Sequence, residues 1–286
     1  MDQLTGFLTL SLVKAAPLIF AALGGVVCER AGILNIALEG QLTVGAFTAV
    51  VVSFVTGSPI LGLAAGIAAG ALCGWLLGFA ATRFNVNQIV AGTGINLLAL
   101  GGCAFGLTVV FGQPGASAEV HALGRSGEYA LILVAFLAAA GLHVALNKTR
   151  WGLRTRAAGE NPHALASASV DPRRVRVLAT ILGGALAGLG GAYLSIGELD
   201  LYSDGMTAGR GFIALAAVIF GRWTPLGATG ASIGFGALAA LQFVLQRSGI
   251  PSELMQALPY LAALAALTGI TGRARAPKAD GIPYTG

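Results

Sequence analysis

The sequence predicts an all-α, polytopic membrane protein with about nine transmembrane helices. Of its 286 residues, 56% are hydrophobic and only 10% are charged, and the mean hydropathy is +0.80. No water-soluble domain of this size has such a composition. The apolar runs are about 20 residues long, enough to cross a hydrocarbon core as helices. They lack the alternation of apolar and polar residues that a β-barrel wall needs.

The longest polar segment, Lys148–Arg176, determines the predicted orientation. It contains seven of the 17 lysine and arginine residues, against two acidic residues. The excess of positive charge in cytoplasmic loops places this segment, which we call the island, inside the cell. Counting outward puts the N-terminus outside and a cytoplasmic tail, residues 272–286, inside. The net charge of +5 therefore reports orientation and does not indicate nucleic-acid binding.

The first predicted span is Leu4–Val27, which is apolar apart from Lys14. Because no basic residue precedes it, it lacks the positive start of a cleavable signal peptide, and we expect it to remain in the mature protein. A polar stretch, Cys28–Gln41, follows. Within it, Glu39 lies too far into the second span to be a loop residue. A carboxylate at that depth usually faces a cavity or a partner.

The second span ends near Val55, and the third, Pro59–Thr82, has a glycine at every fourth position. These glycines predict that the third helix packs closely against another helix; they are Gly62, Gly66, Gly70, Gly74 and Gly78. The fourth span opens at Asn87 and Gln88. It places Gln88, Gly92 and Asn96 on one helical face, which is polar where lipid would not tolerate it.

The remaining spans follow from the apolar runs. The fifth is Glu128–Asn147, after an external loop over residues 111–127, and the sixth is Val177–Ile196, before an acidic external loop over residues 197–205. The apolar stretch over residues 208–223 is too short for a full crossing, so we expect a broken or re-entrant helix enclosed by protein. The last two spans cover residues 225–246 and 254–270, and we expect the Pro- and Gly-rich end of the tail to be disordered.

The island contains signals for a short helix. Asn161 is a good N-cap and Pro162 suits the first helical position, so a helix should start at Pro162. It should end before Asp171 and Pro172, a second cap and proline pair that starts the next membrane helix. The residues leave two interpretations open. The helix docks on a partner, or the island is an ordinary loop whose charges only fix the topology.

The sequence lacks the motifs of an enzyme. No GxxxxGK[ST] loop is present to hold nucleotide phosphates, and no GxGxxG, HExxH or GxSxG motif occurs. The histidines and cysteines are too scattered to predict a metal site, a disulfide or a cofactor; they are His121, His143, His163, Cys28, Cys73 and Cys103. We expect the cysteines to be small buried hydrophobic residues.

Four segments resemble permease subunits of bacterial ATP-binding cassette importers that serve simple sugars, branched-chain amino acids and nucleosides. The segments are Glu29–Gly40, Asn96–Gly101, Gly159–Pro162 and Phe212–Pro225. The first and last look most like the shorter permease chain of the nucleoside branch. Gln41 departs from that pattern, because relatives often have an apolar residue there. It therefore stays open whether two copies of this chain could pair with each other.

The resemblance implies a single transmembrane permease domain over residues 1–286 in the bacterial inner membrane, forming half of a nucleoside path. The implied partners are a second, larger permease, two cytoplasmic ATPase subunits and an extracellular substrate-binding lipoprotein. ATP would be hydrolysed on the ATPase subunits. The island helix then resembles the coupling helix that docks on an ATPase. The implied coupling residues are Arg156, Gly159, Glu160, Asn161, Pro162 and His163.

A nucleoside is neutral and amphipathic, so its path needs hydrogen-bonding groups among apolar walls. The densest supply is Asn35, Glu39, Asn87, Gln88 and Asn96, with Glu39 the strongest candidate. The alternative is that these side chains only satisfy backbone groups freed at helix breaks, or join helices. Transport of sugars or branched-chain amino acids is a second interpretation. An ion-coupled secondary transporter is a third, although such carriers commonly show internal repeats and none is visible here.

Overall fold

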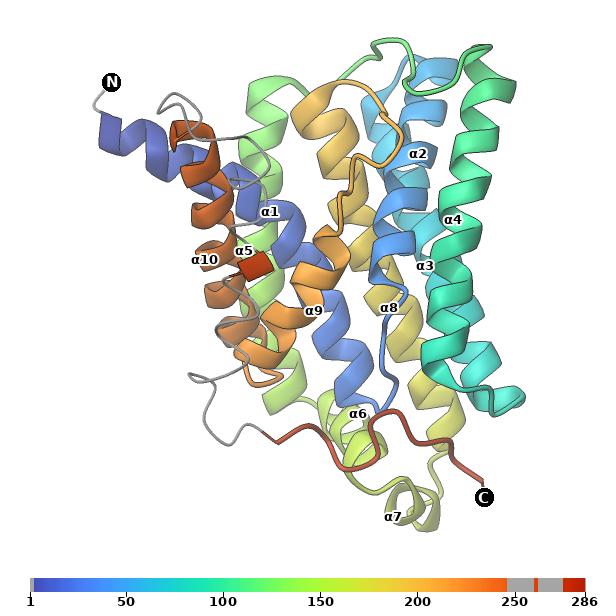
Figure 1. Ribbon diagram of the computed structural model, residues 1–286. Helices are drawn as coiled ribbons and strands as arrows, with labels where there is room; N and C mark the ends of the chain where they lie inside the picture. Colours follow the sequence, from blue (N-terminus) through green and yellow to red (C-terminus); the bar gives the residue numbers. More distant parts are fainter. Residues whose placement is uncertain (1–2, 246–259, 262–274, 286) are drawn as a thin grey trace.

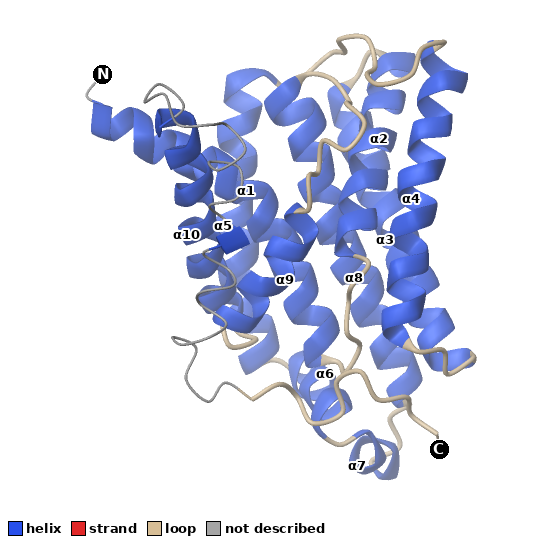
Figure 2. Cartoon of the chain, in the orientation of Figure 1, coloured by secondary structure: helices blue, strands red, loops and turns tan. Residues whose placement is uncertain are grey.

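The computed structural model describes residues 3–245, 260–261 and 275–285, and in these parts it contains helices and no strand (Figures 1 and 2). The helices are α1 (Gln3–Arg30), α2 (Leu38–Thr56), α3 (Pro59–Arg83), α4 (Gln88–Phe111), α5 (Gly124–Lys148), α6 (Arg150–Glu160), α7 (Pro162–Ser167), α8 (Pro172–Ala192), η1 (Tyr193–Leu199), α9 (Arg210–Phe220) and α10 (Pro225–Leu245). Six of the described helices are long and apolar enough to cross a membrane: α1 to α5, and α8 with η1.

The predicted helical class is thus confirmed, while the number of nine spans stays a prediction. α9 has only 11 residues, as expected of a broken segment. α10 covers 21 residues and matches the eighth predicted span closely. The ninth, residues 254–270, lies outside the described residues. Figure 1 shows α6, α7 and residues 275–285 at one end of the bundle, opposite the start of α1.

The first helix lies at the centre of the bundle. Residues 15–29 of α1 are all buried, and α8, α9, α10 and α5 pack around it. A helix that is apolar on all sides suits this position, because every face meets protein. The most apolar part of the N-terminal region therefore forms the core and does not face lipid.

Glycines allow α3 to lie directly against α8. A Cβ atom built on Gly70 would lie 2.3 Å from the carbonyl oxygen of Gly184, and one on Gly74 would lie 2.1 Å from that of Thr180. No side chain fits at such distances, so the two backbones touch through their glycine faces. The close packing predicted for the third helix is confirmed.

Several boundaries differ from the predictions. The island contains two helices, α6 and α7, whereas only the helix at Pro162 was predicted. The fifth span starts at Gly124, four residues earlier than predicted. The sixth continues as the π-helix η1 to Leu199, so the first three residues of the predicted acidic loop are helical. The tail is also ordered over residues 275–285, where Pro277 and Ala279 are buried, and the expectation of disorder is wrong there.

Two non-helical connections bring the chain to the middle of the bundle. Residues 31–37 rise from the end that carries α6 and α7 and lead into α2 (Figure 1). Residues 200–209 descend from the opposite end and lead into α9. As a result, α2 and α9 both begin inside the bundle, where the N–H groups of their first turns need partners.

Candidate functional site

The N-terminal ends of α2 and α9 meet at one carboxylate. Glu39, in the first turn of α2, accepts hydrogen bonds at Oε1 from the Thr207 hydroxyl at 2.6 Å and the Gly209 N–H at 2.8 Å. Its Oε2 accepts from the Gly211 N–H at 2.6 Å. Helix N-termini carry positive partial charge and free N–H groups, so this single negative charge stabilises both helix ends. We call this contact the Glu39 junction.

The backbones of the two helix ends are in direct contact at this junction. A Cβ atom on Gly211 would lie 2.3 Å from the backbone nitrogen of Glu39 and 2.5 Å from its Cα. The Thr43 hydroxyl donates to the Glu39 carbonyl at 2.8 Å and lies 3.2 Å from the Thr207 hydroxyl. Glu39 remains partly exposed at this junction.

The C-terminal end of α1 holds the other end of α9. The Trp223 indole donates to Oε2 of Glu29 at 2.5 Å, and Nε of Arg30 donates to the Trp223 carbonyl at 2.7 Å. Trp223 and its neighbour Arg222 have φ angles of 54° and 55°, in the left-handed region that is costly for residues other than glycine. Residues 29–39 therefore fix both ends of α9.

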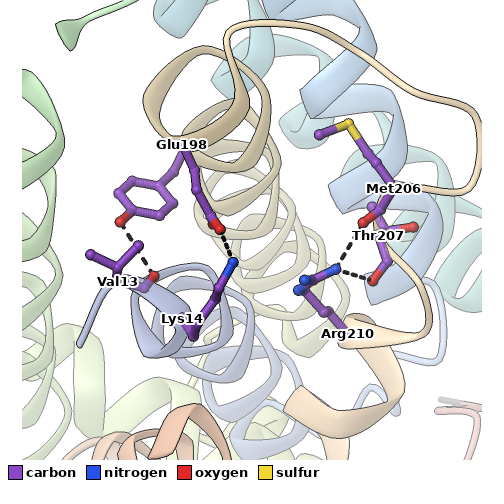
Figure 3. A network of polar contacts seen from close by, with 7 residues as sticks. Val13, Lys14, Glu198, Met206, Thr207 and Arg210 are labelled. Atoms are coloured by element: carbon purple, nitrogen blue, oxygen red, sulfur yellow. Dashed lines mark hydrogen bonds and ion pairs between the residues drawn. The ribbon is translucent and has the colours of Figure 1, made fainter. Parts of the chain in front are cut away.

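Arg210 and Tyr260 lie beside the Glu39 junction and were not predicted as site residues. Nη1 of Arg210 donates to the carbonyl groups of Met206 at 2.8 Å and Thr207 at 3.2 Å (Figure 3). The Tyr260 hydroxyl donates to the Ala208 carbonyl. The sequence held a signal for Arg210, because a cation beside a short apolar segment is costly in a membrane. Tyr260 carried no comparable signal.

An ion pair joins α1 to η1 farther from the island. Nζ of Lys14 donates to Oε1 of Glu198 (Figure 3), and their side chains are 12% and 8% exposed. The Tyr193 hydroxyl donates to the Val13 carbonyl at 3.3 Å. A lone lysine in an apolar span was a signal that a carboxylate partner exists. Glu198 was instead assigned to the external loop.

Three of the predicted path residues support the non-helical connection before α2. Asn96 accepts from the Gly40 N–H at 2.7 Å and donates to the Ile36 carbonyl at 2.9 Å. Gln88 accepts from the Leu34 N–H at 2.7 Å. Asn35 is fully buried, and its amide donates to Oε1 of Gln41 at 3.1 Å. The bonds of Asn96 and Gln88 satisfy backbone groups that a helix would otherwise have paired, whereas the bond of Asn35 joins two side chains.

Asn87 stands apart from these residues. It is exposed and caps α4, where its side chain accepts from the Ile89 N–H at 2.9 Å. The structure therefore gathers Asn35, Glu39, Gln88 and Asn96 around residues 31–40 and leaves Asn87 at a helix end. Within the described parts of the chain, no group of three His, Cys, Asp or Glu side chains could hold a metal ion.

The island forms a second candidate site. The Asn161 side chain accepts from the Ala164 N–H at 3.1 Å and Pro162 is the first residue of α7, so the predicted cap is confirmed. A groove of about 530 Å³ lies between α6 and α7, lined by Leu153, Arg154, Ala157, Glu160, Asn161, Ala164, Leu165, Ala168 and Val170. Glu160 and His163 are exposed, Arg156 is half-buried and Gly159 is buried.

Comparison with known proteins shows the family to which the chain belongs. The family model described as branched-chain amino acid transport system / permease component matches residues 7–267. This chain belongs to that family. It is a multi-pass membrane protein and a component of a transport system. No solved structure matches the permease significantly.

Three relatives of the permease are informative. The guanosine ABC transporter permease protein NupQ of Bacillus subtilis is 38% identical, over 96% of this chain and 94% of the relative. The nucleoside ABC transporter permease protein NupC of Lactococcus lactis is 36% identical, with the same coverage. The putative glucose ABC transporter permease protein TsgC13 of Haloferax volcanii is 33% identical, over 85% of this chain and 78% of the relative.

Proposed function

We propose that this chain is the permease subunit of an ATP-driven importer that carries nucleosides across a bacterial cell membrane. The observation that supports this best is its similarity, over almost its whole length, to two permease proteins whose names specify guanosine and nucleosides. The excess of basic residues in the island supports an orientation with the island and the tail in the cytoplasm and the N-terminus outside. Residues 1–286 then form one transmembrane permease domain.

The chain supplies half of the translocation path in this proposal. Glu39 is only partly buried, and Ala208 and Tyr260 beside it are exposed, so the junction is accessible at the surface of a single chain. A second, larger permease covers this surface and completes the path. Two cytoplasmic ATPase subunits hydrolyse ATP, and an extracellular lipoprotein delivers the substrate. The permease itself carries out no chemical reaction.

The Glu39 junction is the proposed gate of this path. Its carboxylate and the neighbouring hydroxyl groups are hydrogen-bonding partners of the kind that ribose hydroxyls and base edges need. A substrate hydroxyl that bonds to Glu39 would compete with the bonds that hold α9. Asn35, Gln88 and Asn96 hold the connection that carries Glu39, and Asn87 lies at the cytoplasmic entrance. These five residues form our proposed path set.

Uptake competition tests the substrate class. Cells expressing the complete transporter take up labelled guanosine in the presence of excess purine nucleosides, pyrimidine nucleosides, ribose, glucose or branched-chain amino acids. We expect only nucleosides to compete. Competition by glucose or leucine instead would replace the nucleoside assignment. Accumulation by this chain alone in liposomes, driven by a proton or sodium gradient, would contradict an ATP-driven importer altogether.

Sugar transport is the second candidate, supported by the 33% identity to the Haloferax glucose permease. The identity to the nucleoside permeases is higher and covers more of each chain, which favours nucleosides. Branched-chain amino acids have the support of the family description alone.

The island is the proposed docking site for an ATPase subunit, and it yields a prediction. Asn161→Leu removes the side chain that caps α7, a change that costs about 1 kcal/mol at a helix N-terminus. We expect the stimulation of ATP hydrolysis by substrate-loaded binding protein to fall severalfold, measured on the reconstituted complex. Asn161→Asp keeps a capping oxygen and serves as the matched control. Unchanged stimulation in Asn161→Leu would mean that the island only fixes topology.

A further inference from the structure

The ordered tail, residues 275–285, lies across the end of the bundle that carries the island (Figure 1). The Asp280 N–H donates to the Pro277 carbonyl at 3.1 Å, which forms a turn in the tail. The Ala279 N–H donates to the Gly159 carbonyl near the end of α6 at 2.8 Å. The tail is therefore bonded to the island through its backbone.

A buried arginine of α8 joins this tail to two other segments. Arg176 is 1% exposed, and its guanidinium donates to four backbone carbonyl groups. Two are in the tail, at Ala279 and Ile282, with distances of 3.3 and 2.9 Å. The others are at Ala31, directly after α1, and at Ala158 in α6, with distances of 3.1 and 3.2 Å. Because a guanidinium holds its five donors in one plane, it fixes the three segments relative to one another.

Gly32 provides the space that this arrangement needs. Its φ angle is +88°, and a Cβ atom there would lie 2.7 Å from Nη2 of Arg176 and 3.0 Å from the Ala279 carbonyl oxygen. A larger residue would displace either the guanidinium or the tail. The start of the α1–α2 connection is thus shaped around Arg176.

The far end of the tail contacts α7. The Tyr284 ring lies 5.1 Å from the His163 ring, centroid to centroid, and the guanidinium carbon of Arg173 lies 5.9 Å from the Tyr284 centroid. His163 is the second residue of α7. One tail of 11 described residues therefore reaches from the first turn of α7 to the α1–α2 connection.

We propose that residues 275–285 are a clasp that positions α7 relative to the α1–α2 connection, so that the docking helix and the Glu39 junction move together. This rests on the proposed function, in which α7 docks on an ATPase subunit. The connection that starts at Ala31 leads into α2, where Glu39 in the first turn holds α9. Arg176 and Tyr284 are positioning residues in this scheme, and neither touches the substrate.

The clasp also has an expected pH dependence. Burial raises the pKa of Asp280 from 3.8 to about 7, and a backbone hydrogen bond at Gly281 and the nearby Arg176 charge only partly oppose this. The buried Glu29 carboxyl of α1 interacts electrostatically with Asp280. The docked tail therefore binds a proton more tightly than a released tail, so docking is strongest below about pH 4 and weakens as the pH rises to about 7.

A nitroxide spin label attached to Thr285→Cys measures this dependence. We expect its mobility to increase as the pH rises from about 4 to about 7 and to stay constant above that. Asp280→Asn stays neutral at every pH, so its label should remain immobile across the range. An equal pH dependence in both proteins would contradict the role of Asp280.

The test of the clasp compares tail variants in the reconstituted transporter. One protein lacks residues 277–286. Tyr284→Ala removes the ring at α7, while Tyr284→Phe keeps the ring, and Thr285→Ala changes an exposed neighbour as a control. Mutations in a coupling network commonly change coupling by about twofold to thirtyfold. We expect stimulation of ATP hydrolysis by loaded binding protein to fall at least about fivefold in the truncated protein and about twofold in Tyr284→Ala, with basal hydrolysis and co-purification of the ATPase subunits retained.

Each outcome decides the proposal. Wild-type stimulation in both the truncated protein and Tyr284→Ala overturns the clasp. If the truncated protein fails to assemble, the comparison of Tyr284→Ala with Tyr284→Phe tests the clasp instead. Equal stimulation of ATP hydrolysis in these two variants overturns the clasp. Asn161→Leu separates the two proposals. If only Asn161→Leu loses stimulation of ATP hydrolysis, the proposal that α7 docks on an ATPase subunit stands and the clasp is rejected. If no variant loses stimulation, docking by α7 is rejected as well.

Discussion

Glu39→Gln is expected to lower nucleoside uptake at least about tenfold. Glutamine keeps the size of the side chain but loses the charge, and its amide nitrogen would face an N–H group of Gly209 or Gly211. A hydrogen bond to a charged group contributes about 1.5–3 kcal/mol, and about 1.4 kcal/mol corresponds to a tenfold change in rate. The measurement is the initial rate of labelled guanosine uptake in cells with normal amounts of the assembled transporter.

The matched control for this variant is Glu119→Gln, which makes the same chemical change at an exposed acid in the loop between α4 and α5. We expect uptake by the control to equal that of the wild type. Thr207→Ser, which keeps the hydroxyl that donates to Glu39, should also transport normally, while Thr207→Val should not. Normal uptake and substrate preference in assembled Glu39→Gln would show that the junction is not a gate. Failed assembly would show that it is only structural.

Gly211→Ala is expected to destabilise the permease, because its new Cβ atom would lie 2.3 Å from the Glu39 backbone nitrogen. The two nearest atoms belong to the Glu39 backbone and cannot turn aside as a flexible side chain could. α9 would have to move away from α2, which breaks the bonds to Glu39 in addition to the usual overpacking cost of about 1–3 kcal/mol. We expect a fall of several degrees in the thermal midpoint of the detergent-solubilised protein, and a loss of uptake.

The control for this prediction is Gly230→Ala in α10. A Cβ atom at Gly230 would meet no atom within 4 Å, so the same substitution there should leave the thermal midpoint unchanged or raise it slightly through better helix propensity. A Gly211→Ala protein with wild-type stability and uptake would mean that α2 and α9 do not meet as closely as described.

Signals carried by neighbouring residues were predicted well from the sequence. Asn161 with Pro162, and Asp171 with Pro172, start α7 and α8 as expected, because a cap and a proline act within one helical turn. α6 was not predicted, because its sequence, RWGLRTRAAGE, is rich in arginine and resembles a basic cytoplasmic loop. The π-helix η1 was also missed, because no local pattern in the residues distinguishes it from the end of α8.

The polar residues inside the apolar spans show the limit of such reasoning. The cost of a buried charge is evident from one residue, so Glu39 was recognised as a residue that needs a partner. The identity of the partner depends on chain geometry, and Gly209 and Gly211 lie 170 and 172 residues away. Arg176 was interpreted as a cytoplasmic charge that fixes topology. The structure buries it against four carbonyl groups, and three of them lie 103, 106 and 145 residues away in the sequence.

The sequence by itself determined that this protein is helical and membrane-spanning, where most of its helices begin, and which of its side chains could not face lipid. These properties depend on hydropathy, capping and charge, which act along the chain over a few residues. Only the tertiary structure decided that one carboxylate holds the ends of α2 and α9 together, that Lys14 pairs with Glu198, and that the tail is bonded to the island. Such contacts form between residues far apart in sequence, where the packing of whole helices brings hydrogen-bonding groups within about 3 Å of each other.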